Sequence, residues 1–90
     1  MVKLVVSGRY GRMGQRITHL ASEDKNFKIS ALLENPNHPS INEEFHGVKI
    51  NSDGNVIKGS DVLIEFTSPD ATIANLRACI KNKVNMVIGT

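Results

Sequence analysis

Three evenly spaced glycines and one glutamate are the residues whose types and spacing can support chemistry. Gly8, Gly11 and Gly14 follow one another at intervals of three residues, directly after an apolar run. In such a turn the first glycine lets the chain leave a strand, the second lets backbone N–H groups approach a pyrophosphate, and the third lets a helix pack closely. Glu34 lies twenty residues after Gly14, where a carboxylate that binds ribose hydroxyls is expected. This combination predicts a dinucleotide site.

The glycine spacing departs from the usual fingerprint, which is G-x-G-x-x-G, because here it is G-x-x-G-x-x-G. An ordinary strand-to-helix turn without a ligand is the alternative interpretation. The strand before the turn, the helix after it and the position of Glu34 favour a ligand site. The unpaired N–H groups and the partial positive charge at the start of that helix would then serve the phosphates.

The elements that must position these residues alternate between strand and helix. Apolar runs predict strands over residues 2–7, 27–33, 48–50, 61–66 and 84–88. Periodicity predicts a helix from Arg12 and another that follows a Thr67-Ser68-Pro69-Asp70 start signal, with short helical turns at 41–45 and 56–58. This alternation predicts an α/β fold, a Rossmann-like open parallel sheet of about five strands with helices on both faces.

Apolar periodicity also predicts which side chains are buried. The first helix carries four apolar side chains on one side, Met13, Ile17, Leu20 and Ala21. The buried face of the second helix is marked by Ile73, Leu76 and Ile80. Alternation places four side chains of the second strand on one face, Phe27, Ile29, Ala31 and Leu33.

Composition excludes several classes of protein. Ninety residues allow one small domain, and the net charge of +2 is too small to indicate nucleic acid or a membrane surface as a partner. The single cysteine, Cys79, excludes an internal disulfide, lacks the companions of a metal site and is expected to pack as a small apolar side chain. No transmembrane run or secretory signal is present in the sequence, so we expect a cytoplasmic protein.

The remaining polar candidates are less specific. His19, His38 and His46 are expected on the surface, because no acid or nucleophile is placed with them. Glu65 fits a buried acid beside the ligand and an ordinary strand-end carboxylate equally well. Arg12, at the start of the first helix, fits a phosphate contact and simple solvent exposure equally well.

Three short segments carry a resemblance to a known family: Gly11-Arg12-Met13-Gly14, Ile64-Glu65-Phe66-Thr67-Ser68-Pro69 and Val87-Ile88-Gly89-Thr90. In this order they resemble the amino-terminal half of the 4-hydroxy-tetrahydrodipicolinate reductase family, also called dihydrodipicolinate reductases, of bacterial lysine and diaminopimelate synthesis. The resemblance covers the whole chain. It implies a first domain that binds NADH or NADPH, and a second domain that binds the cyclic imine substrate and supplies the catalytic groups.

The resemblance also implies roles for individual residues. The pyrophosphate would be wrapped by Gly8, Arg9, Tyr10, Gly11, Arg12 and Met13. Glu34 would hold the adenosine ribose, Phe66 and Thr67 would lie near the nicotinamide, and Gly89 with Thr90 would begin a turn beside it. Some family members place an arginine for a 2′-phosphate after the acidic residue, whereas this chain has Asn35. NADH is therefore expected to bind at least as tightly as NADPH.

The family's catalytic segment is expected after Thr90. Residues 1–90 are therefore interpreted as a truncated dinucleotide-binding domain with no catalytic residue, inactive alone, and the full-length protein is expected to form a homo-oligomer. Two alternatives stay open. One is a non-catalytic, redox-sensing dinucleotide-binding module, and the other is the cofactor domain of another amino-acid-pathway dehydrogenase.

Overall fold

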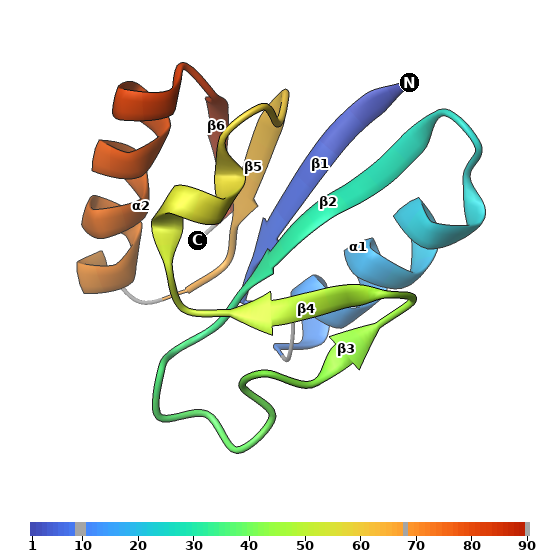
Figure 1. Cartoon of the computed structure of the whole chain (residues 1–90), viewed down its shortest axis with the longest axis horizontal. Helices are drawn as coiled ribbons and strands as arrows, with labels where there is room; N and C mark the ends of the chain where they lie inside the picture. Colours follow the sequence, from blue (N-terminus) through green and yellow to red (C-terminus); the bar gives the residue numbers. More distant parts are fainter. Residues whose placement is uncertain (9–10, 68, 90) are drawn as a thin grey trace.

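A computed structural model describes residues 1–8, 11–67 and 69–89 (Figure 1). Six strands form one sheet in the order β3-β4-β2-β1-β5-β6. In chain order the elements are β1 (Val2–Ser7), α1 (Arg12–Glu23), β2 (Phe27–Leu33), β3 (Glu44–Phe45), β4 (Val48–Asn51), the 3-10 helix η1 (Gly54–Ile57), β5 (Val62–Glu65), α2 (Pro69–Asn82) and β6 (Asn85–Ile88). In Figure 1, α1 lies on one side of the sheet, and α2 and η1 lie on the other. The predicted fold class is confirmed, with six strands in place of about five.

The sheet is parallel except at one edge. β4, β2, β1, β5 and β6 pair in parallel, whereas β3 pairs antiparallel with β4. The helical turn predicted at 41–45 is therefore wrong, because Asn42 has φ 74° and residues 44–45 form β3. His46 has φ 50° and Gly47 has φ 82°. Two successive residues in the left-handed region make the tight two-residue turn that joins β-hairpin strands, and this turn forces residues 44–45 to pair with β4.

Two apolar clusters lie on opposite faces of the sheet. On the α2 side, Val5 of β1 packs with Leu63 of β5 and Ile57 of η1. On the α1 side, Val6 of β1 packs with Leu32 of β2. Because both faces are covered, central strands of a parallel sheet are apolar on both sides.

A β-bulge interrupts the predicted alternation of β2. Leu4 pairs with Ile29 and Val5 pairs with Ala31, which leaves Ser30 as the extra residue. Ile29 therefore joins the α1-side cluster and Ala31 the α2-side cluster, so the prediction that they share a face is wrong.

The buried face of α1 is made by small side chains. Ala21 is buried and Ile17 is half-buried, but Met13 and Leu20 are exposed, contrary to the prediction. Thr18, which is not among the four side chains predicted for the buried side of this helix, is fully buried. Its hydroxyl donates to the backbone carbonyl of Gly14 at 2.6 Å, which satisfies the polar group and lets a small side chain face the sheet.

The apolar face predicted for α2 is also wrong. Three large side chains of this helix are exposed: Ile73 (53%), Leu76 (43%) and Ile80 (70%). The helix instead buries Cys79, which is 2% exposed and packs in the α2-side cluster as predicted, together with Ala78. A Cβ placed on Gly54 of η1 would lie 3.1 Å from the Cβ of Ala78. This close approach leaves room only for small side chains.

Candidate dinucleotide-binding site

The glycine turn begins at Gly8, which is buried at the end of β1. Gly8 has φ 87°, and its N–H donates to the carbonyl of Leu33 at 3.1 Å. A Cβ at this position would lie 2.9 Å from the carbonyl oxygen of Phe66 and 2.9 Å from Cγ2 of Thr67. Both the backbone conformation and the lack of space therefore require glycine.

Gly11 is glycine for a different reason. It is the N-cap of α1, with φ −70° and ψ 164°, values open to any residue. Its N–H donates to the carbonyl of Gly8 at 3.2 Å, and among the residues that the structure describes a Cβ would meet only that carbonyl oxygen, at 3.6 Å. The fold tolerates a side chain here, so the open space in front of Gly11 is available to a ligand. The first turn of α1 contains no acidic residue, so its partial positive charge is not offset there.

The opposite wall comes from the residues that follow β5, with the end of β6 behind them. The Phe66 N–H donates to the carbonyl of Ser7 at 3.1 Å, and the Gly89 N–H donates to the carbonyl of Glu65 at 2.9 Å. The Phe66 ring occupies the space that a Cβ on Gly89 would need. Phe66 and Gly89, which come from two of the three segments that carry the family resemblance, are therefore in contact.

Glu34 follows β2 on the third side. Its N–H donates to the carbonyl of Asn51 at 2.9 Å, and its carboxylate accepts the Asn35 N–H at 3.1 Å. A cleft of about 440 Å³ lies between these segments, at the carboxyl ends of the strands. Its lining comprises Ser7, Gly8, Gly11, Leu33, Glu34, Asn35, Pro36, Ser52, Phe66, Thr67, Ala71, Ala74 and Asn75. The size fits a small-molecule site, and open α/β sheets bind ligands at this end.

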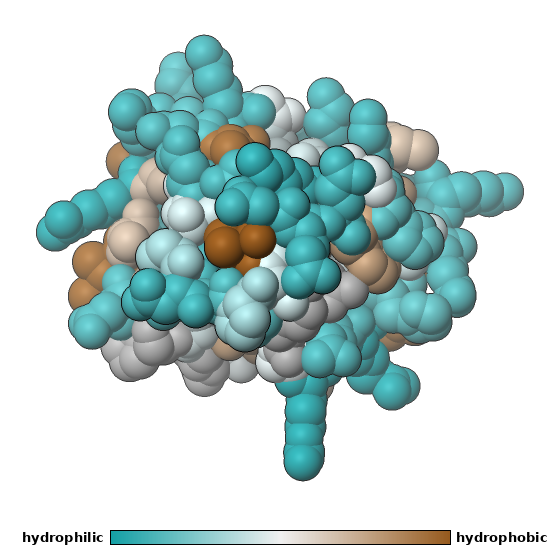
Figure 2. All heavy atoms as spheres, turned by 60° about the horizontal axis from the view of Figure 1, so that its bottom comes forward, coloured by the Kyte–Doolittle hydropathy of each residue, from teal (hydrophilic) through white to brown (hydrophobic). Residues whose placement is uncertain are grey.

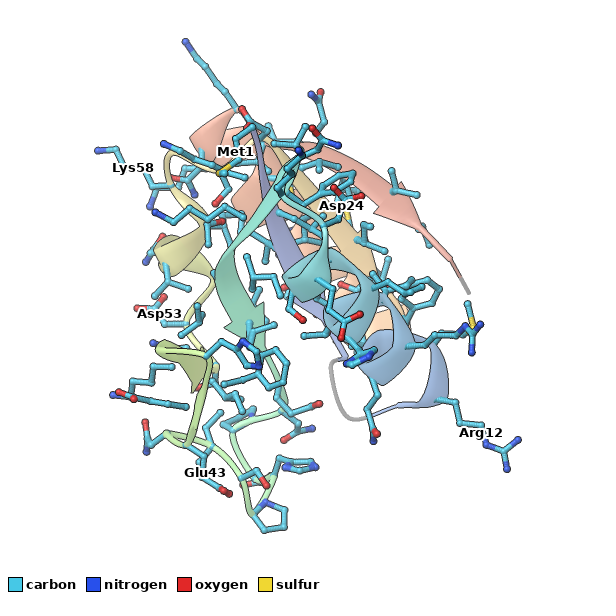
Figure 3. All side chains as sticks on the ribbon, turned by 90° about the vertical axis from the view of Figure 1, so that its right-hand side faces the viewer. Met1, Arg12, Asp24, Glu43, Asp53 and Lys58 are labelled. Atoms are coloured by element: carbon cyan, nitrogen blue, oxygen red, sulfur yellow. The ribbon has the colours of Figure 1, made fainter. Side chains whose placement is uncertain are left out.

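The structure brings part of the predicted site together. Five predicted residues line the cleft: Gly8, Gly11, Glu34, Phe66 and Thr67. Gly89 stands behind the Phe66 ring and is absent from the lining. Arg12 and Met13 are exposed and do not line it, and Figure 3 shows the Arg12 side chain projecting away from the fold. The predictions for Arg9, Tyr10 and Thr90, and for the Ser68 helix cap, lie outside the described residues.

Several residues that line the cleft were not predicted from the sequence. Ser7, Ser52 and Asn75 add polar groups, and Ala71 and Ala74 form a wall of small side chains on α2. Asn75 carried a signal, because asparagine is unfavourable inside a helix unless its side chain has a partner. Nothing in the local sequence indicates that Ser52 lines the cleft, since its position depends on the path of the chain after β4.

Glu65 is buried beneath the cleft, with 0% of its surface exposed. One carboxylate oxygen, Oε1, accepts the Thr67 N–H at 2.9 Å and the Thr67 hydroxyl. The other oxygen, Oε2, accepts the Asn75 amide, which also donates to the Ser7 hydroxyl at 2.9 Å. Of the two interpretations of Glu65, the structure supports the buried acid. Burial and the charge of Glu65 raise the pKa of the Cys79 thiol.

A second hollow, of about 470 Å³, lies at the amino ends of β1 and β2. Its lining includes Lys3, Lys28, Lys49 and Lys58. It is slightly larger than the cleft beside Gly8, but neither of its glycines, Gly47 and Gly59, lies between a strand and the start of a helix. The cleft at the carboxyl ends of the strands is therefore the candidate dinucleotide site.

The other candidate chemistry has no support in the structure. His19 is exposed and lies 3.3 Å from the exposed Glu23 carboxylate, and His46 is exposed in the hairpin turn. Across residues 1–8, 11–67 and 69–89, no group of three or more His, Cys, Asp or Glu side chains is placed to hold a metal ion.

Neither α1 nor α2 is long and apolar enough to cross a membrane. Figure 2, which brings the lower side of Figure 1 forward, shows a mostly hydrophilic surface with apolar side chains in small separate patches.

The parallel sheet, the glycine turn between β1 and α1, and the cleft at the carboxyl ends of the strands define a Rossmann-type dinucleotide-binding domain. The model of the family "Dihydrodipicolinate reductase, N-terminus" matches residues 2–90. The chain belongs to this family.

Curated relatives are similar over the same region. The chain is 41% identical over 99 residues to the 4-hydroxy-tetrahydrodipicolinate reductase of Geotalea daltonii, and 37% identical over 98 residues to that of Nitrosomonas eutropha. Each match covers 100% of this chain and 37% of the relative, so the chain spans little more than a third of their length. A solved dihydrodipicolinate reductase from Paenisporosarcina sp. TG-14, bound to dipicolinate, has the same fold with a TM-score of 0.82 at 22% identity, over 100% of this chain and 37% of that one.

Proposed function

We propose that residues 1–90 form the nicotinamide-dinucleotide-binding domain of a reductase that transfers hydride to the cyclic imine 4-hydroxy-tetrahydrodipicolinate. Membership of the family and the names of the curated relatives support this proposal. The single observation that carries it is the glycine turn. Gly8 is glycine because the fold requires it, whereas Gly11 leaves open space at the mouth of a cleft where the fold does not require glycine.

The residues present fit a dinucleotide. The backbone between Gly8 and Gly11 would hold the pyrophosphate, because a Cβ is missing where phosphate must approach and α1 starts there with an unopposed partial charge. The Glu34 carboxylate would accept hydrogen bonds from ribose hydroxyls. Phe66 and Thr67 would border the nicotinamide end, with Gly89 behind them and Thr90 following.

When bound, the reduced nicotinamide would supply a hydride to a ring carbon of the conjugated imine. The described residues bind and orient this group, and we assign none of them a catalytic role. Positioning two reactants together is worth about 7–11 kcal/mol of the barrier. Residues 1–90 alone would hold one reactant without the other, so we propose that they do not turn over substrate.

Three finer properties belong to the same proposal. We expect NADH to bind at least as tightly as NADPH, because Glu34 repels a 2′-phosphate and Asn35 offers no compensating charge. We propose a cytoplasmic location, because residues 1–90 contain one cysteine and therefore no disulfide pair among themselves, which fits a reducing compartment. We also expect the full-length protein to form a homo-oligomer, on the resemblance to the reductase family.

The test is a paired assay on the full-length protein. NADH binding is titrated by nicotinamide fluorescence, and NADH oxidation is followed after the cyclic imine is generated in the same solution. We expect both binding and turnover. Binding without turnover would replace the reductase with a non-catalytic dinucleotide module, and turnover only with another substrate would indicate another dehydrogenase. Absence of NADH and NADPH binding would contradict the site itself.

A further inference from the structure

We propose that Glu65 is a positioning residue of the dinucleotide cleft. Its buried carboxylate holds Thr67 and Asn75, two residues that line the cleft, without itself lining it. The proposal rests on the proposed function for the identity of the ligand. The arrangement of the cleft wall is independent of that identity.

The geometry begins with two neighbouring strands. Ser7 ends β1 and pairs in register with Glu65, which ends β5. Asn75, on the helix α2 above them, donates its amide to the Ser7 hydroxyl at 2.9 Å and to the Glu65 carboxylate. The Asn75 amide thus joins the ends of β1 and β5 to α2 at the floor of the cleft.

The other carboxylate oxygen of Glu65, Oε1, holds the residues that follow β5. It accepts the Thr67 N–H at 2.9 Å and the Thr67 hydroxyl. These bonds fold residues 65–67 into a tight turn. The Phe66 carbonyl oxygen and Thr67 Cγ2 of this turn both come within 2.9 Å of where a Gly8 Cβ would lie. Any displacement of the turn therefore changes the space around Gly8.

A carboxylate is suited to this place because all its partners are donors. A buried carboxylate is costly unless several hydrogen bonds satisfy it, and here a backbone N–H, a hydroxyl and an amide do so. A glutamine has the same size, but its NH₂ group would face one of these donors. The three bonds cannot all survive that exchange, so either the turn or Asn75 must move.

The first test needs no ligand. Hydrogen exchange is measured on the full-length protein and on its Glu65→Gln variant, both without dinucleotide. Exchange is expected to speed up by about tenfold or more at whichever partner loses its bond, the Thr67 amide or the Asn75 side-chain amide, while Ile29 in β2 is unaffected. Glu44→Gln is the matched control, because Glu44 is exposed on β3. Unchanged exchange at both Thr67 and the Asn75 side chain would overturn the proposal.

The second test separates positioning from general loss of structure. Affinities for NADH and for AMP are measured on the same proteins by calorimetry. Glu65→Gln is expected to weaken NADH about tenfold and AMP about threefold or less, because the displaced turn borders the nicotinamide end and AMP lacks that end. Equal weakening of both ligands, or of neither, would overturn the proposal. If the parent binds neither ligand while the exchange difference persists, the proposed function fails and the positioning role stands.

A second variant keeps the proposal testable if Glu65→Gln does not fold. Thr67→Val retains the carboxylate and removes one of its donors. Thr67→Val is also expected to weaken NADH binding more than AMP binding, by smaller factors than Glu65→Gln. Asn75→Ala added to Thr67→Val is expected to weaken NADH binding by less than the sum of the two single changes, since both act through one carboxylate. The role of Glu65 would be contradicted if the two losses of NADH affinity added fully in the double variant. It would also be contradicted if Thr67→Val weakened NADH and AMP binding equally.

Discussion

The phenyl ring of Phe66 stands where a side chain on Gly89 would have to be. The Gly89 N–H also donates to the carbonyl of Glu65 at 2.9 Å. The ends of β5 and β6 are therefore held together by a backbone hydrogen bond and a ring over a glycine. Gly89 supports the cleft from behind by making room for Phe66, although it does not line the cleft.

Gly89→Ala tests this support. The new methyl group must displace the Phe66 ring, and overpacking of this kind lowers the free energy of unfolding by about 1–3 kcal/mol. Urea denaturation of the full-length protein measures the change. Asn85→Ala, on the exposed part of β6, is the control and is expected to change stability far less. Equal stability of Gly89→Ala and the parent would show that the ring has room to move.

Gly8 and Gly11 are expected to respond differently to substitution. Gly8→Ala should destabilise the fold, because it combines a positive φ with a Cβ only 2.9 Å from the Phe66 carbonyl oxygen. Gly11→Val should leave the sheet largely intact and abolish NADH binding, since its side chain would fill the space that we propose for the pyrophosphate. Circular dichroism melting and calorimetry measure the two effects. A Gly11→Val protein that binds NADH as the parent does would remove the glycine turn from the site.

Glu34 is expected to set the choice of cofactor. The parent should bind NADH at least as tightly as NADPH at physiological salt. Glu34→Gln removes a negative charge, so NADH binding should weaken while NADPH binding is retained or improves. Fluorescence titration with both dinucleotides measures the ratio of the two affinities, and Glu44→Gln, an exposed residue that does not line the cleft, should leave this ratio unchanged. A parent with a clear preference for NADPH would contradict the assignment of Glu34.

Cys79 is expected to make stability fall at alkaline pH. Burial and the Glu65 charge raise the pKa of this thiol above its ordinary value of 9.0. The folded state therefore favours the neutral thiol, and this contribution is complete below pH 9 and is lost as the pH rises through the folded pKa. Urea denaturation between pH 7 and about pH 10.5 should show a steeper loss for the parent than for Cys79→Ala. Parallel curves for the two proteins would refute the shift.

Residues 1–90 expressed alone are expected to self-associate. The exposed side of α2 presents Ile73 and Ile80, and Val87 and Ile88 of β6 are also exposed at a sheet edge. Ile73→Gln with Ile80→Gln should reduce association in sedimentation velocity, because these changes remove apolar surface without disturbing the core. Val56→Gln, on η1, is the control. A monomeric parent fragment would refute the prediction.

The strand and helix alternation of this chain was predictable from sequence because it depends on local patterns. Val2–Ser7 and Phe27–Leu33 are strands with the predicted bounds, since short apolar runs between polar turns have few alternatives. The spacing of the glycines and of Glu34 also predicted that these residues follow the ends of β1 and β2. Gly8, Gly11, Glu34, Phe66 and Thr67 then met at one cleft, because the carboxyl ends of parallel strands share one edge.

Only the tertiary structure decided which apolar side chains are buried and what holds the cleft. Ile73 and Ile80 have the pattern of a core face, yet α2 turns Cys79 and Ala78 towards the sheet because η1 approaches closely there. The partners of Glu65 come from positions two and ten residues further on, in a turn and in a helix. Sequence records residue types along the chain, whereas burial and hydrogen bonding depend on distances between elements, which are set only when the helices pack on the sheet.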